Sequence, residues 1–110
     1  MINTYILTGR LTRDFELQEK DNKKFANNTL AVSRLYKNSN GEYDTDFFNF
    51  TIFDNNLENY IDRYKKGDLI GLKGTLTTYD NKICLNVDRM TLITSKSKKD
   101  EIEQEKKLDM

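Results

Sequence analysis

The chain has 110 residues and no formal net charge, because 18 Lys and Arg residues balance 18 Asp and Glu residues. This length predicts one small domain with a single core. The balanced charge excludes a uniformly basic protein, so binding to a polyanion would depend on where the charges lie rather than on their sum.

The residues that most often carry chemistry are scarce in this sequence. It has no His, and Cys84 is its single cysteine. Their scarcity excludes an internal disulfide and argues against thiolate metal sites and His-based acid-base catalysis. The carboxylates are scattered over predicted turns and strand ends, with no neighbouring group to tune them. We therefore expect a protein that is not an enzyme and uses no metal or cofactor.

Membrane insertion and secretion are not expected. The longest apolar runs, such as Tyr5–Leu7, are only a few residues long, and the first residues lack the charged and apolar regions of a signal peptide. A lone thiol is also typical of a reducing compartment. These features predict a soluble, cytoplasmic protein.

Apolar and polar residues alternate along most of the chain, and proline is absent. This pattern predicts extended strands, divided by turn residues into about five segments. The strands are expected at residues 2–12, 25–36, 43–53, 70–79 and from 82 onward. The polar run 19–24 is expected to turn in solvent. Asn40-Gly41 predicts an antiparallel hairpin between the second and third strands, and Asp80-Asn81 a short turn before the last.

The alternation is interrupted between residues 54 and 64, where apolar residues recur at spacings of three and four. These residues are Leu57, Tyr60, Ile61 and Tyr64. They predict a helix of about two to three turns, with Asp54 or Asn55 as the N-cap and Gly67 as its stop. In the strands that follow, Gly71 and Gly74 predict a sharp bend, and a change of parity near Asp88-Arg89 predicts a bulge.

Three strands, one helix and two strands, with glycines that permit bending, predict an all-β fold with one helix. The order is that of the OB fold, a five-stranded Greek-key barrel with the helix between strands three and four. This domain is expected to cover residues 1–94. Residues 95–110 carry five basic and five acidic residues, and we expect them to form a charged, flexible C-terminal tail.

The strand at residues 43–53 has aromatic residues on both parities. Phe48, Phe50 and Ile52 share one parity and are expected in the core, which leaves Phe47 and Phe53 on the face that is normally polar. Tyr36 and Tyr79 also occupy non-core positions, with Arg34, Lys37 and Lys73 expected nearby. Rings that stack on bases, together with cations that bind phosphates, are typical of single-strand binding. A subunit interface or isolated exposed rings would give the same pattern.

Five blocks of the sequence occur in the order, and at nearly the spacing, found in bacterial and phage single-stranded DNA-binding proteins. The blocks are residues 1–17, Thr29–Arg34, Tyr36–Asn38, Gly41–Phe47 and Lys66–Ile70. Over residues 1–93 the chain closely resembles this family. The resemblance implies an OB fold and non-catalytic, largely sequence-independent binding of single-stranded DNA in replication, recombination and repair.

The resemblance also implies which residues bind DNA. The positions where bases stack in the family are Tyr36, Phe47 and Phe53, with Tyr79 a looser match because its loop is shorter here. The expected phosphate contacts are Arg10, Arg34, Lys37, Lys65, Lys66 and Lys73. Relatives often have Trp where this chain has Tyr and Phe, which suggests weaker contact per base.

The family is usually a homotetramer, built from pairs that join through the first strand region, and we expect a homo-oligomer here, with a dimer as the alternative. Two departures concern the fold: Phe15 stands where relatives usually have Pro, and Asn28 where an apolar residue is usual. Chromosomal members end in an acidic tip with a terminal Phe that recruits replication enzymes. This sequence ends in Lys107–Met110, so that recruitment is not expected. A phage or mobile-element origin is suggested, with a truncated paralogue as the alternative.

A second hypothesis comes from a different functional class. The exposed aromatic residues could dock a protein partner, as in an OB-fold interaction module similar to the primosomal restart proteins, with only weak DNA binding. The absent acidic tip and the zero net charge motivate this alternative.

Overall fold

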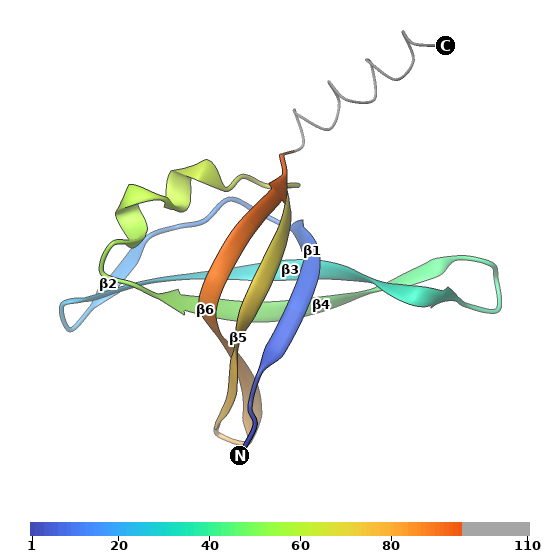
Figure 1. Cartoon of the computed structure of the whole chain (residues 1–110), viewed down its shortest axis with the longest axis horizontal. Coiled ribbons are helices and arrows are strands. Elements are labelled where there is room, and N and C mark those ends of the chain that lie inside the picture. Colours follow the sequence, from blue (N-terminus) through green and yellow to red (C-terminus); the bar gives the residue numbers. More distant parts are fainter. Residues whose placement is uncertain (96–110) are drawn as a thin grey trace, which may run out of the picture.

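The computed structural model describes residues 1–95 as strands wound around one core, with two short 3₁₀ turns (Figure 1). The strands are β1 (Tyr5–Leu11), β2 (Gln18–Lys20), β3 (Lys23–Lys37), β4 (Tyr43–Phe53), β5 (Leu69–Tyr79) and β6 (Lys82–Thr94). The 3₁₀ turns, η1 (Leu57–Asn59) and η2 (Ile61–Arg63), lie between β4 and β5. Within residues 1–95, no helix is long and apolar enough to cross a membrane.

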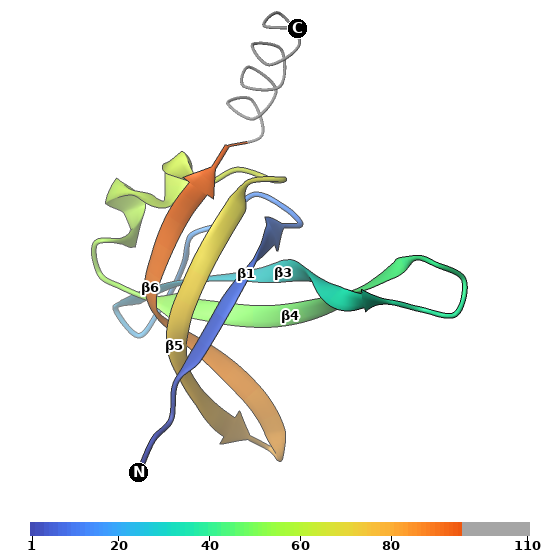
Figure 2. The same ribbon diagram turned by 45° about the vertical axis from the view of Figure 1, so that its right-hand side comes forward.

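The strands form a closed barrel. Their hydrogen-bonded order is β1-β5-β6-β4-β3-β2, and an additional pairing of β1 with β3 closes five of them into a ring, with β2 outside it along β3. All neighbours are antiparallel except β4 and β6, which pair in parallel at Phe50 and Leu85. Figure 2 shows β1, β5 and β6 crossing steeply over β3 and β4. The predicted five-stranded barrel of the OB type is confirmed.

The two-residue turns follow from side chains that tolerate a left-handed backbone. Asp21, Asn22, Asp80 and Asn81 all have positive φ, as the tight turns of β-hairpins require. The expectation that residues 19–24 only turn in solvent is wrong in part. The turn occupies Asp21-Asn22 alone, and the residues on either side pair as β2 and the start of β3.

The hairpin between β3 and β4 is the longest in the structure, and it extends beyond the barrel (Figures 1 and 2). Gly41 takes a φ of 78° at its tip, and the Asn38 side chain accepts hydrogen bonds from the backbone N–H groups of Asn40 and Glu42. The antiparallel pairing predicted from Asn40-Gly41 is confirmed. We call residues 33–45 of this hairpin the arm.

The predicted helix is correct in place but not in form, because residues 54–64 make two consecutive 3₁₀ turns. The Asp54 carboxylate does not cap a helix. It accepts a hydrogen bond from the backbone N–H of Asn56 and another from the Tyr60 hydroxyl. Asn56 is the N-cap residue of the first 3₁₀ turn, and no side-chain hydrogen bond caps that turn. Gly67 lies beyond the second turn and donates its N–H to the carbonyl of Leu11.

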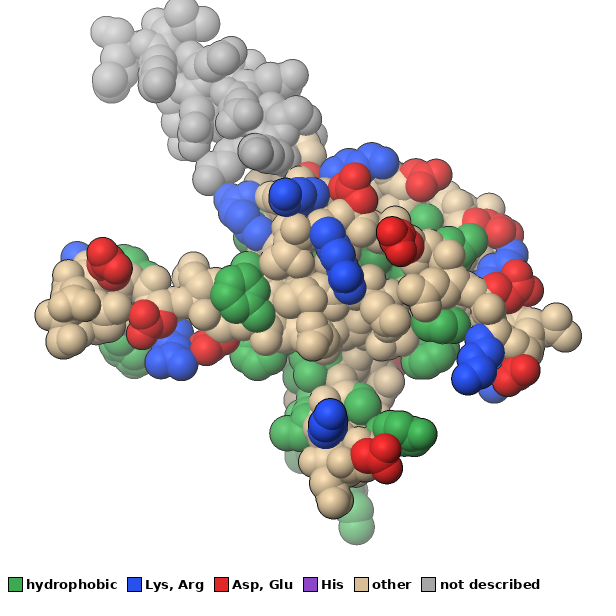
Figure 3. Space-filling model, turned by 180° about the vertical axis from the view of Figure 1, so that it is seen from behind, with side chains coloured by type: hydrophobic (Ala, Val, Ile, Leu, Met, Phe, Trp, Pro, Cys, Tyr) green, Lys and Arg blue, Asp and Glu red, His purple; other side chains and the backbone are tan. Residues whose placement is uncertain are grey.

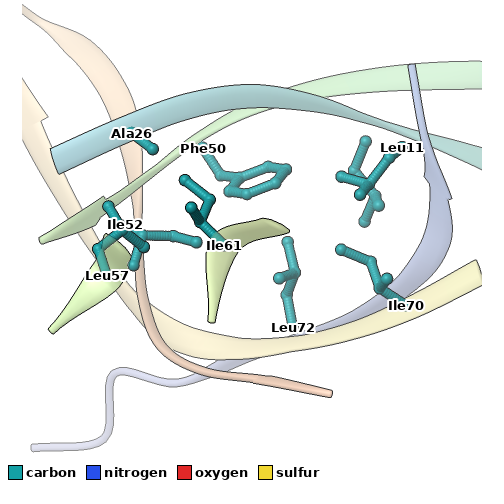
Figure 4. Packing of buried hydrophobic residues seen from close by; sticks show 9 residues of the cluster. Leu11, Ala26, Phe50, Ile52, Leu57, Ile61, Ile70 and Leu72 are labelled. Carbon is teal, nitrogen blue, oxygen red and sulfur yellow. The ribbon is translucent and has the colours of Figure 1, made fainter. Parts of the chain in front are cut away.

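Among residues 1–95, nine hydrophobic residues are buried in the core (Figure 4): Leu11, Ala26, Leu30, Phe50, Ile52, Leu57, Ile61, Ile70 and Leu72. Leu57 and Ile61 come from the two 3₁₀ turns, which cover one end of the barrel. Phe15, at the position where relatives usually have Pro, packs the edge of its ring against Phe50 and Tyr64. The substitution therefore adds an aromatic contact to the core.

Asn28, the second departure from the family pattern, is satisfied locally. Asn28 is 1% exposed, but its amide donates to the carbonyl of Arg13 and its oxygen accepts from the N–H of Thr29. Both ends of the buried side-chain amide therefore have a hydrogen-bond partner, which offsets the cost of removing it from water.

Gly74 lies where β5 crosses closely over β6, and a Cβ there would sit 1.8 Å from the backbone oxygen of Asn86. The ladder shifts register between Lys73 and Gly74, which confirms the bulge predicted near Asp88.

Candidate nucleic-acid interface

The two parities of β4 face opposite sides of the sheet. Phe50 and Ile52 are buried and Phe48 is half-buried, whereas Phe47 and Phe53 keep 65% and 61% of their surface exposed. The predicted division of this strand into a core face and an aromatic outer face is confirmed. Phe47 and Phe53 are six residues apart, which at about 3.3 Å per residue separates them by roughly 20 Å.

Polar side chains fill the outer face between these two rings. The hydroxyl of Thr51 donates to Oδ1 of Asn27 at 2.7 Å, and the hydroxyl of Thr29 donates to Oδ1 of Asn49 at 2.6 Å. The side-chain oxygen of each asparagine therefore already accepts a hydrogen bond from a threonine. Among residues 1–95, neither side-chain NH₂ group has a hydrogen-bond partner, so both remain available as donors to an incoming ligand.

A second ring accompanies Phe53. Phe25 of β3 is its direct cross-strand partner, and the two ring centroids lie 5.8 Å apart with an angle of 36° between the ring planes. Figure 3 views this outer face from behind Figure 1. It shows hydrophobic side chains on the arm and on the opposite side of the barrel, with a mostly uncharged polar surface between them.

The arm carries a further group of aromatic side chains. Tyr36 is 82% exposed, and a register shift between Ser33 and Lys37 interrupts the ladder around it. Tyr43 shares the parity of Phe47, and Nζ of Lys37 lies 5.8 Å from the centre of the Tyr43 ring. Lys37 thus stays near the aromatic face, as predicted, in a cation–π contact.

Arg34 of the arm is held by two acidic residues of β4. Its Nε and Nη2 donate to the two carboxylate oxygens of Asp46, both at 3.0 Å, and Nη1 lies 3.9 Å from Asp44. This hydrogen-bonded pairing raises the pKa of Arg34 and lowers the pKa of Asp46. Asp46 has the parity opposite to Phe47 on β4. The structure therefore directs Arg34 to carboxylates rather than to the aromatic face.

The other predicted cations are dispersed. Arg10 pairs with Ala31, which in turn pairs with Phe47, so the register sets Arg10 two strands from that ring, about 10 Å away. Lys73 lies opposite Ile6 and Arg89 on the outer side of β1, β5 and β6. Lys65 and Lys66 are exposed in the loop after η2.

Tyr79 lies apart from the other predicted rings. It is 74% exposed at the far end of β5, opposite Lys82. The β5–β6 hairpin leaves the barrel in a different direction from the arm (Figure 1). Of the four predicted stacking residues, the structure brings Phe47 and Phe53 onto one continuous sheet face.

Several residues of this face were not predicted from the sequence. Phe25 and Tyr43 each add a ring, and Arg13 lines a hollow beside Asn27, Asn49 and Thr51. Applying the alternation used for β4 to β3 would have identified Phe25, because it shares the polar parity of Asn27 and Thr29. No comparable signal marks Arg13, whose position depends on the path of the chain after β1.

The sequence resembles those of known proteins over most of its length. The sequence model of the single-strand binding protein family matches residues 2–96. Single-stranded DNA-binding proteins of Streptococcus mutans and Streptococcus pneumoniae are each 45% identical over 85 residues, 74% of this chain. The matched part is 52% and 54% of their respective lengths, so the chain spans about half of these relatives.

Solved structures share the fold, and one of them is a domain of PriB protein. The N-terminal domain of PriB protein from Thermoanaerobacter tencongensis, described as dimeric, superposes with a TM-score of 0.62 and 23% identity. The match covers 84% of this chain and 98% of that domain. At this identity the similarity establishes the OB-type fold alone.

Proposed function

This chain belongs to the single-strand binding protein family, and from that premise we propose that it binds single-stranded DNA without catalysing a reaction. The observation that carries the proposal is the pair of exposed rings, Phe47 and Phe53, on the outer face of β4. Every base presents a flat π face, so stacking on these rings depends little on sequence.

The geometry supports a DNA path along β4. A strand that follows this face meets Phe53 at one end and Phe47 at the other, with the amide donors of Asn27 and Asn49 between them. Those NH₂ groups would donate to base or phosphate oxygens. A duplex cannot use the rings in this way, because its bases are already stacked and paired. We therefore expect preference for single strands.

The charges of the face agree with modest phosphate binding. The chain has no net charge, and Arg34 is already bonded to Asp46, so Arg10 and Lys37 are the predicted cations that stand nearest the Phe47 end. Phosphate contacts release counterions, with a salt slope of about −0.7 per contact for single strands. A shallow salt dependence, with stacking as the larger contribution, is the expected signature.

Fluorescence anisotropy with an oligo-dT and a duplex of equal length tests the proposal. We expect clear preference for the single strand and a loss of affinity with rising salt. Equal or negligible affinity for both ligands would contradict it. If DNA affinity is weaker than ~10⁻⁴ M while the protein captures a helicase or primase subunit in a pull-down, the interaction-module hypothesis is favoured instead.

We further propose that copies of this chain associate through the region of β1. Along Tyr5–Gly9, β1 pairs only with β5, because its contact with β3 is confined to Arg10 and Leu11. Ile6 projects from this segment with 73% of its surface exposed. An unpaired strand edge beside an exposed apolar residue favours pairing with a second copy.

Light scattering on the wild type and on Ile6→Glu tests this association. A two-fold interface would bring the two introduced carboxylates together, so we expect the wild-type oligomer to dissociate in the variant. Circular dichroism controls for the fold of each protein. An interface through β1 would be ruled out if the wild type is monomeric at all concentrations. It would also be ruled out if the variant forms an oligomer of the same molar mass as the wild type.

A further inference from the structure

A surface hollow of about 430 Å³ opens at the end of the β3–β4 sheet that is remote from the arm. Its lining residues are Lys20, Asp21, Lys23, Phe25, Asn27, Thr51 and Phe53. The strand register explains why these residues share one face. Lys20 pairs with Lys23, Phe25 with Phe53, and Asn27 with Thr51, and direct partners point to the same side of a sheet.

The two rings form one apolar surface within the hollow. Phe25 is half-buried, whereas Phe53 is 61% exposed, and the ring planes are tilted by 36° with their centroids 5.8 Å apart, so the two rings lie side by side in the lining. A flat ligand that covers both rings would bury more aromatic area than one ring offers. The pairing of β3 with β4 sets Phe25 and Phe53 directly opposite each other in the folded chain.

The two lysines are set against each other. As direct cross-strand partners they place like charges side by side, which costs stability. No salt bridge involves either lysine within residues 1–95, and Asp21 supplies the single carboxylate of the lining. The neighbouring Lys24 faces the other way and bonds to Glu58 at 2.7 Å. An anion in the hollow would relieve the repulsion between Lys20 and Lys23.

The polar wall offers a directed donor. Asn27 accepts the Thr51 hydroxyl through Oδ1, so the two protons of its NH₂ group are unused within residues 1–95 and can be donated to a ligand in the hollow. All four DNA bases carry acceptor atoms on their edges. An aromatic floor, a pair of cations and an amide donor together match the three parts of a nucleotide that bind proteins: the base face, the phosphate and the base edge.

We infer that this hollow binds one nucleotide of a single DNA strand. The base stacks on Phe25 and Phe53, the Asn27 amide donates to its edge, and the phosphate lies between Lys20 and Lys23. The inference rests on the proposed function and extends it. It assigns a role to Phe25 and to the two lysines of the β2–β3 hairpin. It also places one nucleotide of the bound strand at this end of the sheet.

Oligo-dT titrations of Phe25→Leu, Phe53→Leu and the double variant test the aromatic surface. Leucine keeps apolar bulk but removes the π face, so thermal unfolding midpoints should change little. Loss of one stacked base corresponds to about a 5- to 150-fold rise in Kd. Because both rings hold the same base, the double variant should bind little worse than either single variant.

Lys20→Gln and Lys23→Gln test the phosphate contact, with Lys24→Gln as the matched control on the opposite face of the same strand. Each of the first two variants should flatten the plot of log Kd against log salt, by up to about 0.7 for one lost phosphate contact. The control should keep the wild-type slope. Equal slopes for Lys23→Gln and Lys24→Gln would overturn the assignment of a phosphate to this hollow.

Photocrosslinking locates the base directly. An oligo-dT with one 5-iodouracil per molecule should crosslink to Phe25 or Phe53, identified by mass spectrometry of the peptides. If the wild type binds oligo-dT but crosslinks elsewhere and the leucine variants bind normally, the hollow is not a nucleotide site and the proposed function stands. If the wild type does not bind oligo-dT, both conclusions fall.

Discussion

The two ends of the outer β3–β4 face contain the same kinds of residues but use them differently. At the arm end, Arg34 is bonded to Asp46 and Lys37 lies over Tyr43. At the barrel end, Lys20 and Lys23 have no ion pair within the described residues, and they flank Phe25 and Phe53. The count of aromatic and basic residues is thus a poor guide to binding, because what matters is which cations remain unpaired.

The ends also differ in what supports them. Phe53 follows Ile52 and Phe50, which are buried in the barrel core. Among the strand pairings of residues 1–95, only the β3–β4 ladder includes the arm, since β1 pairs with β3 no farther along than Ala31. We therefore expect substitutions in the arm to change binding without changing stability, and substitutions beneath the barrel end to change both.

The largest effect is expected for Phe50→Ala, beneath the barrel end. Phe50 is 2% exposed and contacts the Phe15 ring, so truncation leaves a cavity and should lower the free energy of unfolding by ~3–5 kcal/mol. Urea denaturation measures it. Tyr43→Ala on the arm is the comparison, and a similar loss of stability there would show that the arm is part of the cooperative core.

A smaller effect is expected for Phe47→Ala and Phe53→Ala, one at each end of the outer face. Each should weaken oligo-dT binding by ~1–3 kcal/mol through the loss of one stacked base. Both rings are more than half exposed, so the melting temperature should be nearly unchanged. If Phe47→Ala unfolds the protein while the folded fraction binds normally, the assignment of the two faces of β4 is wrong.

Asp46→Asn should make the arm end more like the barrel end, because it leaves a cation at the arm end without its hydrogen-bonded carboxylate partner. The substitution removes the charged partner of Arg34 and frees its guanidinium to contact phosphate. We expect modestly tighter oligo-dT binding at low salt and a salt slope steeper by up to about 0.7. Arg34→Gln in the same background should return the slope to the wild-type value. An unchanged slope in Asp46→Asn would mean that Arg34 does not reach the DNA.

The smallest expected effect is a decrease in the stability of the barrel in alkaline solution. Burial, reinforced by the hydrogen bond to Asp54, raises the pKa of Tyr60 to about 12, above the value of about 10 in an unfolded chain. Below pH 10 the hydroxyl is neutral in both states. As the pH rises from 10 to 12 the unfolded chain loses this proton first, so stability falls.

Urea denaturation at a series of pH values from 9 to 11.5 measures this fall. Tyr60→Phe should lessen it, and part of it should remain because burial also raises the pKa of Tyr5 to about 12. A variant with the same pH dependence as the wild type would show that Tyr60 ionises equally in the folded and unfolded chains.

Much of the architecture was determined by local sequence. A two-residue period fixes which side chains of β4 enter the core, so the separation of Phe50 from Phe47 and Phe53 could be predicted without a structure. The turns at Asn40-Gly41 and Asp80-Asn81 depend on residues that tolerate positive φ, and the bulge near Asp88 follows from a change of parity. These features require only neighbouring residues.

Tertiary structure decided the features that depend on register between strands. Phe25 meets Phe53 because the β3–β4 ladder runs without interruption from the barrel end to Ser33. The same register pairs Val32 with Asp46 and so places Arg34 diagonally across from Asp46. The 3₁₀ form of residues 54–64 depends on Asp54 and on the burial of Leu57 and Ile61. Periodicity reports the face on which a side chain lies, but a cross-strand neighbour depends on loop lengths and bulges, which only the folded chain determines.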